Sequence, residues 1–431
     1  MPSQITSRSY AYAGLEDVFR NGFSVGECAT RLRRFCAIEN RLMQIQAAHM
    51  VSVPQRDFKT LLARFLYENA RHTDTLRRRL RELRVPKKSL DAAPDEELLV
   101  VLDELLFARN SAELVAGLRW LQNELRAAYN DYLQHTNHLA DFPSVEVINA
   151  IVAHQNLGIA LLDAAHDDLV DEAQKESANA FVAHLQLCLE AAGGIDGTGA
   201  SSTRCARERS TQAFVIKHEL ARDELLQRVW DFVAPPQSEV GPHLSHMMSI
   251  RLSEINVAEG LAIVLFETRD KPWEFYFAIA RHLWDEVRHS LMGEAAIEAT
   301  LGDRAALPMR DYEGFYCMEA TPLEQYATLG LEVEGANMRY PIGKRGEWEF
   351  CKDAAQHPLM TTFQDFDWAD EVLHVNIARE QLSQWFEGGA RALSEFAVQG
   401  KAHRTQVKKR HAPVELPVVE DIVQRGRGLN H

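Results

Sequence analysis

Two short segments of the chain repeat the same arrangement of acidic and imidazole side chains. The sequences WDEVRH and WADEVLH both contain the pattern D-E-V-x-H. Residues three apart on a helix project from one face, which places Glu286 beside His289 and Glu371 beside His374. A carboxylate and an imidazole on one helix face can bind the same metal ion. Two such helices that face each other can therefore bind two metal ions.

The repetition argues against chance as the origin of these pairs. One E-x-x-H pair is weak evidence in a chain with 17 histidines. The sequence holds only two such pairs, and both lie inside D-E-V-x-H. We therefore interpret the four side chains as candidate ligands of a dinuclear metal site.

A dinuclear site in a helical bundle also needs one Glu from each of two further helices. Ahead of the first pair, the segment MMSIRLSEINVAEGLAIVLFE offers Glu254 and Glu259. Antiparallel helices of about 20 residues place mid-helix positions roughly 25–35 residues apart. Glu254 precedes Glu286 by 286 − 254 = 32 residues, and Glu259 precedes it by 27. We prefer Glu254, with Glu259 as the alternative.

The fourth carboxylate is expected from the segment LEQYATLGLEVEGANMRYP, which offers Glu332 and Glu334 ahead of the second pair. Glu334 shares an apolar stripe with Leu331 and Met338, so we prefer it to Glu332. The segment before it, TLGDRAALPMRDYEGFYCMEATP, is long enough for a single crossover connection between the second and third helices.

These residues and their order resemble the ferritin-like di-iron carboxylate superfamily over roughly residues 240–390. The DEVRH form is similar to bacterial ferritin-like families of oxygenase or oxidase type, and more distantly to di-iron tRNA hydroxylases and arylamine N-oxygenases. The resemblance implies a four-helix bundle with a crossover connection, two Fe ions or a Mn/Fe pair, and O2 as co-substrate. The implied metal ligands are Glu254, Glu286, His289, Glu334, Glu371 and His374.

The resemblance also implies roles for three neighbouring residues. In that superfamily the Asp before each Glu accepts a hydrogen bond from the second ring nitrogen of a ligand His. By the pseudo-twofold symmetry of the bundle, Asp370 would support His289 and Asp285 would support His374. The alternative is that both Asp residues pair with surface arginines. His282, one turn before the first pair, is either an extra ligand, as in the N-oxygenases, or a partly buried His near the bundle end.

Helical periodicity extends over almost the whole chain, and short alternating strand patterns are nearly absent, which predicts an all-α protein. A Gly/Ser-rich stretch followed by APPQSEVGP divides the chain into two parts. We expect a helical domain at 1–190, a connector at 191–240 and the ferritin-like domain at 241–400. Residues 401–431 are expected to form a tail that lies on the surface or reaches a partner subunit.

The N-terminal domain contains a partial match to the same two motifs. In YENARH, Asn69 and His72 stand where the first Glu and His stand in WDEVRH, and Glu39 lies 30 residues before Asn69. Ile151 and His154 take the places of the second pair. We interpret this domain as a degenerate ferritin-like bundle without the carboxylates for two metals. The alternative is chance similarity between amphipathic helices.

Composition excludes several classes of function. The net charge of −15 argues against nucleic-acid or anionic-membrane binding. The six cysteines have no CxxC spacing, so we expect reduced thiols in a cytoplasmic protein. The sequence contains no N-terminal signal pattern and no run of about 18 apolar residues, so we expect no membrane association.

The sequence thus predicts a non-haem di-iron oxygenase or oxidase that uses O2 to hydroxylate or N-oxygenate a small organic substrate. We expect an external electron donor and a homodimer. One alternative is an iron-handling or peroxide-reducing ferritin-like protein without an organic substrate, and another is a metal-bearing scaffold protein. A closed, partly apolar cavity beside the metals would favour the oxygenase.

Overall fold

The computed structural model describes residues 8–92, 94–199 and 204–429. Nearly all the regular structure in these ranges is helical, which confirms the predicted all-α class. The two strands found there are each two residues long. They are β1 (Arg228–Val229) and β2 (Met309–Arg310), and they pair in parallel.

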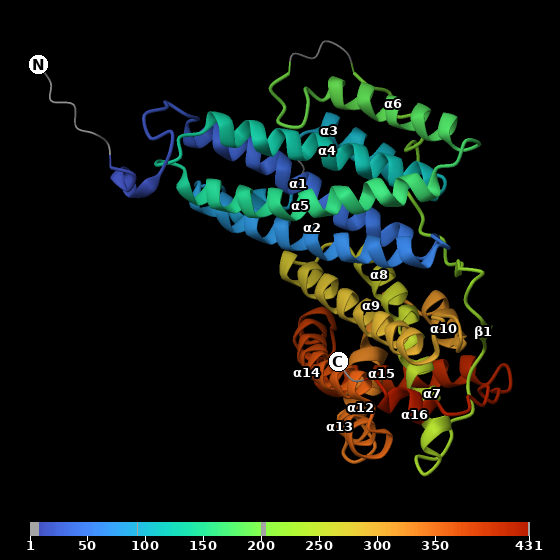
Figure 1. Cartoon of the computed structure of the whole chain (residues 1–431). Coiled ribbons are helices and arrows are strands. Elements are labelled where there is room, and N and C mark those ends of the chain that lie inside the picture. Colours follow the sequence, from blue (N-terminus) through green and yellow to red (C-terminus); the bar gives the residue numbers. More distant parts are fainter. Residues whose placement is uncertain (1–7, 93, 200–203, 430–431) are drawn as a thin grey trace, which may run out of the picture. The chain divides into compact units, whose positions relative to one another are not determined.

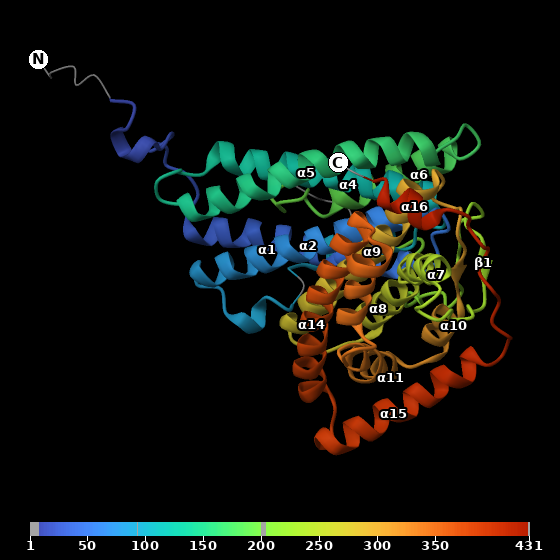
Figure 2. The same cartoon turned by 60° about the horizontal axis from the view of Figure 1, so that its bottom comes forward.

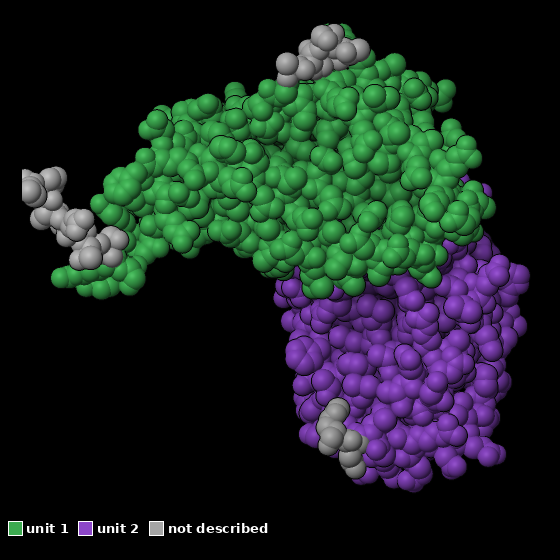
Figure 3. Space-filling view, turned by 45° about the horizontal axis from the view of Figure 1, so that its top comes forward, with its two compact units in different colours: residues 1–45, 68–215 green, residues 46–67, 216–431 purple. Residues whose placement is uncertain are grey.

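The chain divides into two compact units, coloured separately in Figure 3. Unit 1 comprises residues 1–45 and 68–215, and unit 2 comprises residues 46–67 and 216–431. Unit 1 differs from the predicted domain at 1–190 because it lacks residues 46–67 and extends to residue 215, and the predicted connector at 191–240 is shared between the two units. Residues 200–203 of that connector lie outside the described residues.

Buried ion pairs explain why residues 46–67 belong to unit 2. Arg56 contacts Glu294 at 2.5 Å, with both side chains buried. The ammonium of Lys59 contacts the fully buried carboxylate of Glu259. Separating such pairs would leave charges uncompensated in the protein interior, which is costly.

Unit 1 contains most of α1 and α2, both of which run across the boundary, together with four further helices and two short 3-10 turns. The elements are η1 (Ala11–Gly14), α1 (Val25–Met50), α2 (Arg56–Glu82), η2 (Lys87–Ser89), α3 (Glu96–Leu106), α4 (Ser111–His135), α5 (Phe142–Leu169) and α6 (Lys175–Ala191). In Figures 1 and 2, α1, α2, α4 and α5 lie side by side. Helix α6 packs on α3 and α4. The side chains of Asp95 and Asn110 cap the N-termini of α3 and α4.

The residues expected to be remnants of a metal site meet inside unit 1. The amide of Asn69 donates to Glu39, whose carboxylate also lies 3.2 Å from Nδ1 of His72. Nε2 of His72 lies 3.3 Å from Nδ1 of His154. Ile151 is buried beside them on α5. This polar cluster therefore contains one carboxylate, Glu39, where a dinuclear site would need several.

The cysteine prediction is wrong for one pair in unit 1. Cys188 on α6 and Cys205 on the segment after it form a disulfide, with their Cα atoms 5.0 Å apart. The two cysteines are 17 residues apart in the sequence, so no short-spacing motif predicts the disulfide. The other four cysteines are free and buried.

Unit 2 consists of helices around a long central α9. Its elements are α7 (Val240–Leu252), α8 (Ile255–Glu267), α9 (Trp273–Leu301), α10 (Tyr312–Glu319), α11 (Pro322–Ala327), the π-helical η3 (Thr328–Val333), α12 (Glu334–Asn337), α13 (Lys344–Glu349), the π-helical η4 (Phe350–Ala355), α14 (Pro358–Trp385), α15 (Gly389–Lys408) and α16 (Ile422–Arg427). Helix α8 packs on α9 and α11, and α14 packs on α9 and η3. These contacts close a ring of four helical segments, which is a helical bundle.

The first helix of the bundle is interrupted, whereas the sequence pattern predicted one continuous helix. Helix α7 ends at Leu252 and α8 begins at Ile255, so Glu254 lies at the junction. Helix α9 approaches this junction closely at Gly293, where an added Cβ would lie 2.3 Å from the Leu252 nitrogen. The hydroxyl of Ser290 donates to the Leu252 carbonyl. These contacts fix the position of Glu254 against α9.

Part of the predicted C-terminal tail at 401–431 is helical. Helix α15 continues to Lys408, and α16 packs on α7 and α9. Val407 and Ile422 are buried. Apolar side chains spaced too sparsely for a clear helical pattern nevertheless anchor this segment.

Among the described residues, one helix is long and apolar enough by composition to cross a membrane. It is α5, and 39% of its most apolar window is buried within the structure. Its buried residues include Ile148, Ile159 and Leu162 on one side of the helix.

His357 caps α14, the helix that carries the second predicted pair. Its Nδ1 accepts a hydrogen bond from the Met360 amide. Nε2 lies 2.9 Å from the hydroxyl of Thr300, which itself donates to Ala296. The ring therefore has its single proton on Nε2 and is neutral. Burial lowers the pKa of His357 to about 4.

We predict that His357 makes the stability of the protein fall between pH 6.5 and pH 4. The unfolded imidazole takes up a proton near pH 6.5, whereas the folded one resists protonation until about pH 4. The free energy of unfolding therefore contains the full contribution of His357 above pH 6.5, and it falls by about 3 kcal/mol as the pH drops to 4. The variant His357→Asn keeps a capping side chain without a titration. Urea unfolding at several pH values should show that the free energy of unfolding of this variant lacks the decrease of about 3 kcal/mol.

The matched control is His411→Asn, at an exposed position of the same unit. It should retain the pH dependence of the unsubstituted protein. Parallel pH profiles for His357→Asn and the unsubstituted protein would contradict the assignment of a neutral His357.

Candidate metal centre

Eight buried or nearly buried side chains of unit 2 form two adjoining groups of potential metal ligands. In each group one donor atom per residue lies within 4.8 Å of all the others. The first group is His282, Glu286, Glu334 and His374, and the second is Glu254, His289, Asp367 and Glu371. All six predicted ligands belong to these two groups. Their role as metal ligands stays a prediction.

The ligands come from all four segments of the bundle. Glu254 lies at the junction of α7 and α8, and Glu334 begins α12 directly after the π-helical η3. Helices α9 and α14 supply three residues each with identical spacing. These are His282, Glu286 and His289 on α9, and Asp367, Glu371 and His374 on α14. Single π-helical turns within helices are frequent at functional sites.

Glu286 lies between the two histidines of the repeated motifs. Its Oε1 is 3.3 Å from Nδ1 of His374 and 3.8 Å from Nδ1 of His289. The centroids of the two imidazole rings are 5.8 Å apart. One carboxylate that faces both imidazoles is the arrangement that a bridging ligand between two metal ions requires.

Each motif histidine is oriented by the Asp of the opposite motif. Nε2 of His289 lies 3.4 Å from Asp370, and Nε2 of His374 lies 3.3 Å from Asp285. These are the crossed hydrogen bonds expected from pseudo-twofold symmetry. Arg288 contacts both Asp residues, at 2.6 and 3.0 Å. Both readings of the Asp residues therefore apply, because each pairs with an arginine and with a histidine.

Several polar atoms of the two groups have no hydrogen-bond partner. Among the described residues, these buried atoms include Nδ1 of His289, Nδ1 of His374, Oε2 of Glu334 and Oε2 of Glu371. Buried polar atoms are rarely left unpaired, and unpaired ones call for an explanation. The two imidazole nitrogens face Glu286 and could each bind a metal ion.

Two permanent cations lie beside the second group. The ammonium of Lys344 is 2.9 Å from Asp367 and 2.8 Å from Glu371, and its side chain is almost fully buried. Arg251 contacts Asp367 at 2.5 Å and Glu254 at 2.9 Å. The two groups together hold five carboxylates, so 5 − 2 = 3 negative charges remain without a permanent partner.

Protonation supplies the missing positive charge when no metal is bound. Burial alone would lower the pKa of His282, but the carboxylates of Glu334 and Glu286 raise it to about 10. His289 also has a raised pKa, because nearby carboxylates outweigh its burial. Burial raises the pKa of Glu254 to about 8. Metal ions that bind these side chains must displace their protons.

The structure separates the alternative ligands left open by the sequence. Glu259 lies outside both groups and pairs with Lys59 and Arg222. Glu332 pairs with Lys401 and is partly exposed. Glu254 and Glu334 are the members of the cluster, and His282 joins them through a 2.8 Å contact with Glu334.

Sequence reasoning missed three residues of the site. Asp367 lies one turn before Glu371, as His282 lies one turn before Glu286, so the spacing x-x-x-E-x-x-H could have identified it. Lys344 and Arg251 could not have been found this way. They come from segments without a metal-binding pattern and reach the site only through the fold.

A small cavity adjoins the helices that carry the cluster. It is lined by Val257 on α8, Leu329 and Val333 of η3, and the polar side chains of Gln325 and Arg404. Its volume of about 20 Å³ is enough for one water-sized molecule.

No protein-family model, curated protein or solved structure matches this chain.

We predict that Lys344→Met destabilises the metal-free protein. Loss of the ammonium leaves Glu371 buried without its cation and Asp367 with Arg251 alone, which costs about 3–5 kcal/mol. Mn²⁺ should restore most of this loss, because a metal ion supplies the same positive charge. Urea unfolding in a chelator and in excess Mn²⁺ measures both effects.

Lys352→Met is the matched control, because Lys352 is exposed on the adjacent η4. It should change the free energy of unfolding by less than about 0.5 kcal/mol. If Mn²⁺ stabilises Lys344→Met no more than the unsubstituted protein, the Lys344 ammonium does not supply the positive charge that a metal ion would otherwise supply.

Proposed function

We propose that unit 2 is an O2-dependent oxidoreductase of the ferritin-like di-iron type. The observation that carries the proposal is the position of Glu286 between His289 and His374, each held by a crossed Asp. Side chains arranged to satisfy only one another would not leave Nδ1 of both motif histidines unpaired. Two ions, one in each group, would use these nitrogens.

The donor set favours iron or manganese over other metals. Carboxylate oxygens and imidazole nitrogens suit these ions, whereas zinc and copper sites often include thiolates. Neither group of described residues contains a cysteine. Two Fe(II) ions, when bound, would supply electrons for the reduction of O2, and an external donor would restore them.

The side chains around the ligands would keep the centre rigid and dry. Asp285 and Asp370 fix the orientation of the imidazole rings, and Arg281 and Arg288 hold both carboxylates in place. His289 and His374 are fully buried, so bulk water does not reach their ligand atoms. Exclusion of water protects reactive species from side reactions.

The substrate would be a small organic molecule that is hydroxylated or N-oxygenated. The cavity lined by Val257 and Val333 has a volume of about 20 Å³, and an organic substrate would need more space than this. The same observation favours a second candidate, the oxidation of iron or the reduction of peroxide without an organic substrate. Reduction of O2 at the same rate with and without organic compounds would select this second function.

The test is anaerobic Fe(II) loading followed by exposure to O2, with optical and Mössbauer monitoring. We expect about two Fe per chain and rapid oxidation of both by O2. His374→Ala removes an imidazole and the partner of Asp285, and it should reduce loading to one Fe or fewer and slow O2 consumption at least 100-fold.

Glu332→Gln is the matched control, because Glu332 lies two residues from Glu334 but points to Lys401. It should retain both metals and the rate of oxidation. A stoichiometry far below two for the unsubstituted protein, or unchanged O2 consumption in His374→Ala, would refute the proposed function.

A further inference from the structure

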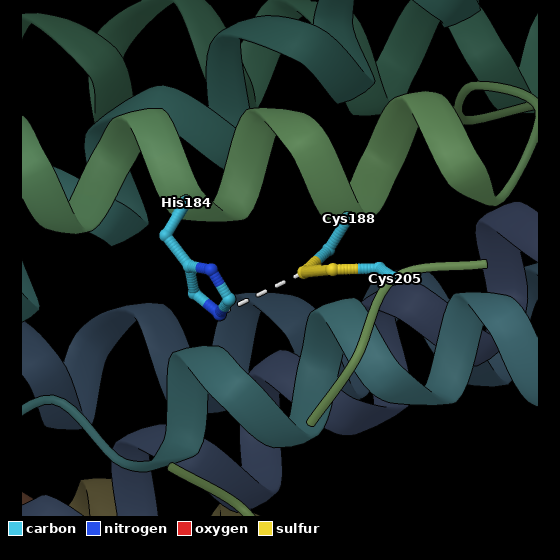
Figure 4. A group of neighbouring side chains, drawn as sticks. All are labelled: His184, Cys188 and Cys205. Carbon is cyan, nitrogen blue, oxygen red and sulfur yellow. Dashed lines mark hydrogen bonds between the residues drawn. A yellow bond between two sulfur atoms is a disulfide. The ribbon is translucent and has the colours of Figure 1, made fainter. Parts of the chain in front are cut away.

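Unit 1 contains a second group of metal-ligating side chains, unrelated to the centre in unit 2. His184 and Cys188 lie one turn apart on α6, and Cys205 approaches them from the segment that follows the helix (Figure 4). Their donor atoms lie within 4.8 Å of one another. Nε2 of His184 is 3.7 Å from the sulfur of Cys188, which is bonded to the sulfur of Cys205.

The segment that carries Cys205 is held in place without the disulfide. Arg207 contacts Asp103 of α3 at 2.6 Å, and Arg209 contacts Glu113 of α4 at 2.6 Å. The backbone amide of Ser210 donates to Glu104 at 2.9 Å. Reduction of the disulfide therefore leaves Cys205 close to Cys188, and the two thiols remain available to one ion.

Glu104 lies next to the imidazole, outside the group of three donor atoms. Its Oε2 lies 2.9 Å from Nε2 of His184, and the side chain is fully buried. The backbone amides of Arg209 and Ser210 donate to its carboxylate and order it there. A movement toward the sulfurs would make it the fourth ligand. Two sulfurs, one imidazole and one carboxylate would then form a four-coordinate set typical of zinc.

We propose that the reduced form of this group binds one Zn²⁺ ion through Cys188, Cys205, His184 and Glu104. The disulfide is the metal-free form of the same site. Hydrogen peroxide interconverts the two: both thiolates give up one electron each as the S–S bond forms, and peroxide takes the two electrons and two protons to become two waters. Loss of both sulfur ligands then releases the Zn²⁺ ion. The proposal does not depend on the function proposed for unit 2.

Cobalt is the probe that separates this site from the centre in unit 2. Co²⁺ bound to thiolate has an intense near-ultraviolet charge-transfer band, and the two ligand groups of unit 2 contain no sulfur. We expect the reduced full-length chain to develop this band with about one Co²⁺ per chain, and Zn²⁺ to abolish it. Cys205→Ser, at a partly exposed position, should lose the band while the protein stays folded. His184→Ala should weaken Zn²⁺ binding at least tenfold.

Cys36→Ala is the matched control, because Cys36 is a free, buried thiol of the same unit. It should retain the cobalt band. Addition of hydrogen peroxide to the zinc-loaded protein should release one Zn²⁺ for each disulfide formed, measured with a zinc indicator and by mass spectrometry. Absence of the band in the reduced protein, or its persistence in Cys205→Ser, would overturn the proposal and leave a purely structural disulfide.

Discussion

Negative charge buried at one point of a helical bundle is the constraint on which unit 2 depends. Lys344 and Arg251 offset two of the five carboxylates, and the remainder need protons or metal ions. Ionised carboxylates in a low-dielectric interior are too costly to persist without compensation. Helix packing, the junction at Glu254 and the crossed Asp–His hydrogen bonds all serve to bring these groups together. The five carboxylates are Glu254, Glu286, Glu334, Asp367 and Glu371.

The sequence predicted the parts of this centre that follow from helical geometry alone. Residues three and four apart share a helix face whatever surrounds them, so Glu286, His289, Glu371 and His374 could be paired without a structure. The choice between Glu254 and Glu259 was less secure, because the sequence pattern places both on one continuous helix. It depends on Lys59, some 200 residues away in the sequence, which pairs with Glu259. Long-range pairing of this kind leaves no local pattern.

Domain boundaries were predicted less well for a related reason. Glycine, serine and proline mark where regular structure stops, but they do not show which helices pack together. Helices α1 and α2 continue across the boundary between the two units, so no composition change marks it. The disulfide between Cys188 and Cys205 was missed because its two residues meet only where the connector returns along α3. In unit 1, by contrast, the predicted remnant residues Glu39, Asn69 and His72 do meet.

The proposed function requires that the cluster in unit 2 bind two metal ions, one in each group of side chains. Crystals grown with Mn²⁺ and measured at its absorption edge test this directly. We expect two anomalous peaks on either side of the Glu286 carboxylate, about 3.5–4 Å apart. One peak should lie beside His374 and the other beside His289. A single peak, or an empty cluster with Lys344 still bound to Asp367 and Glu371, would contradict the account.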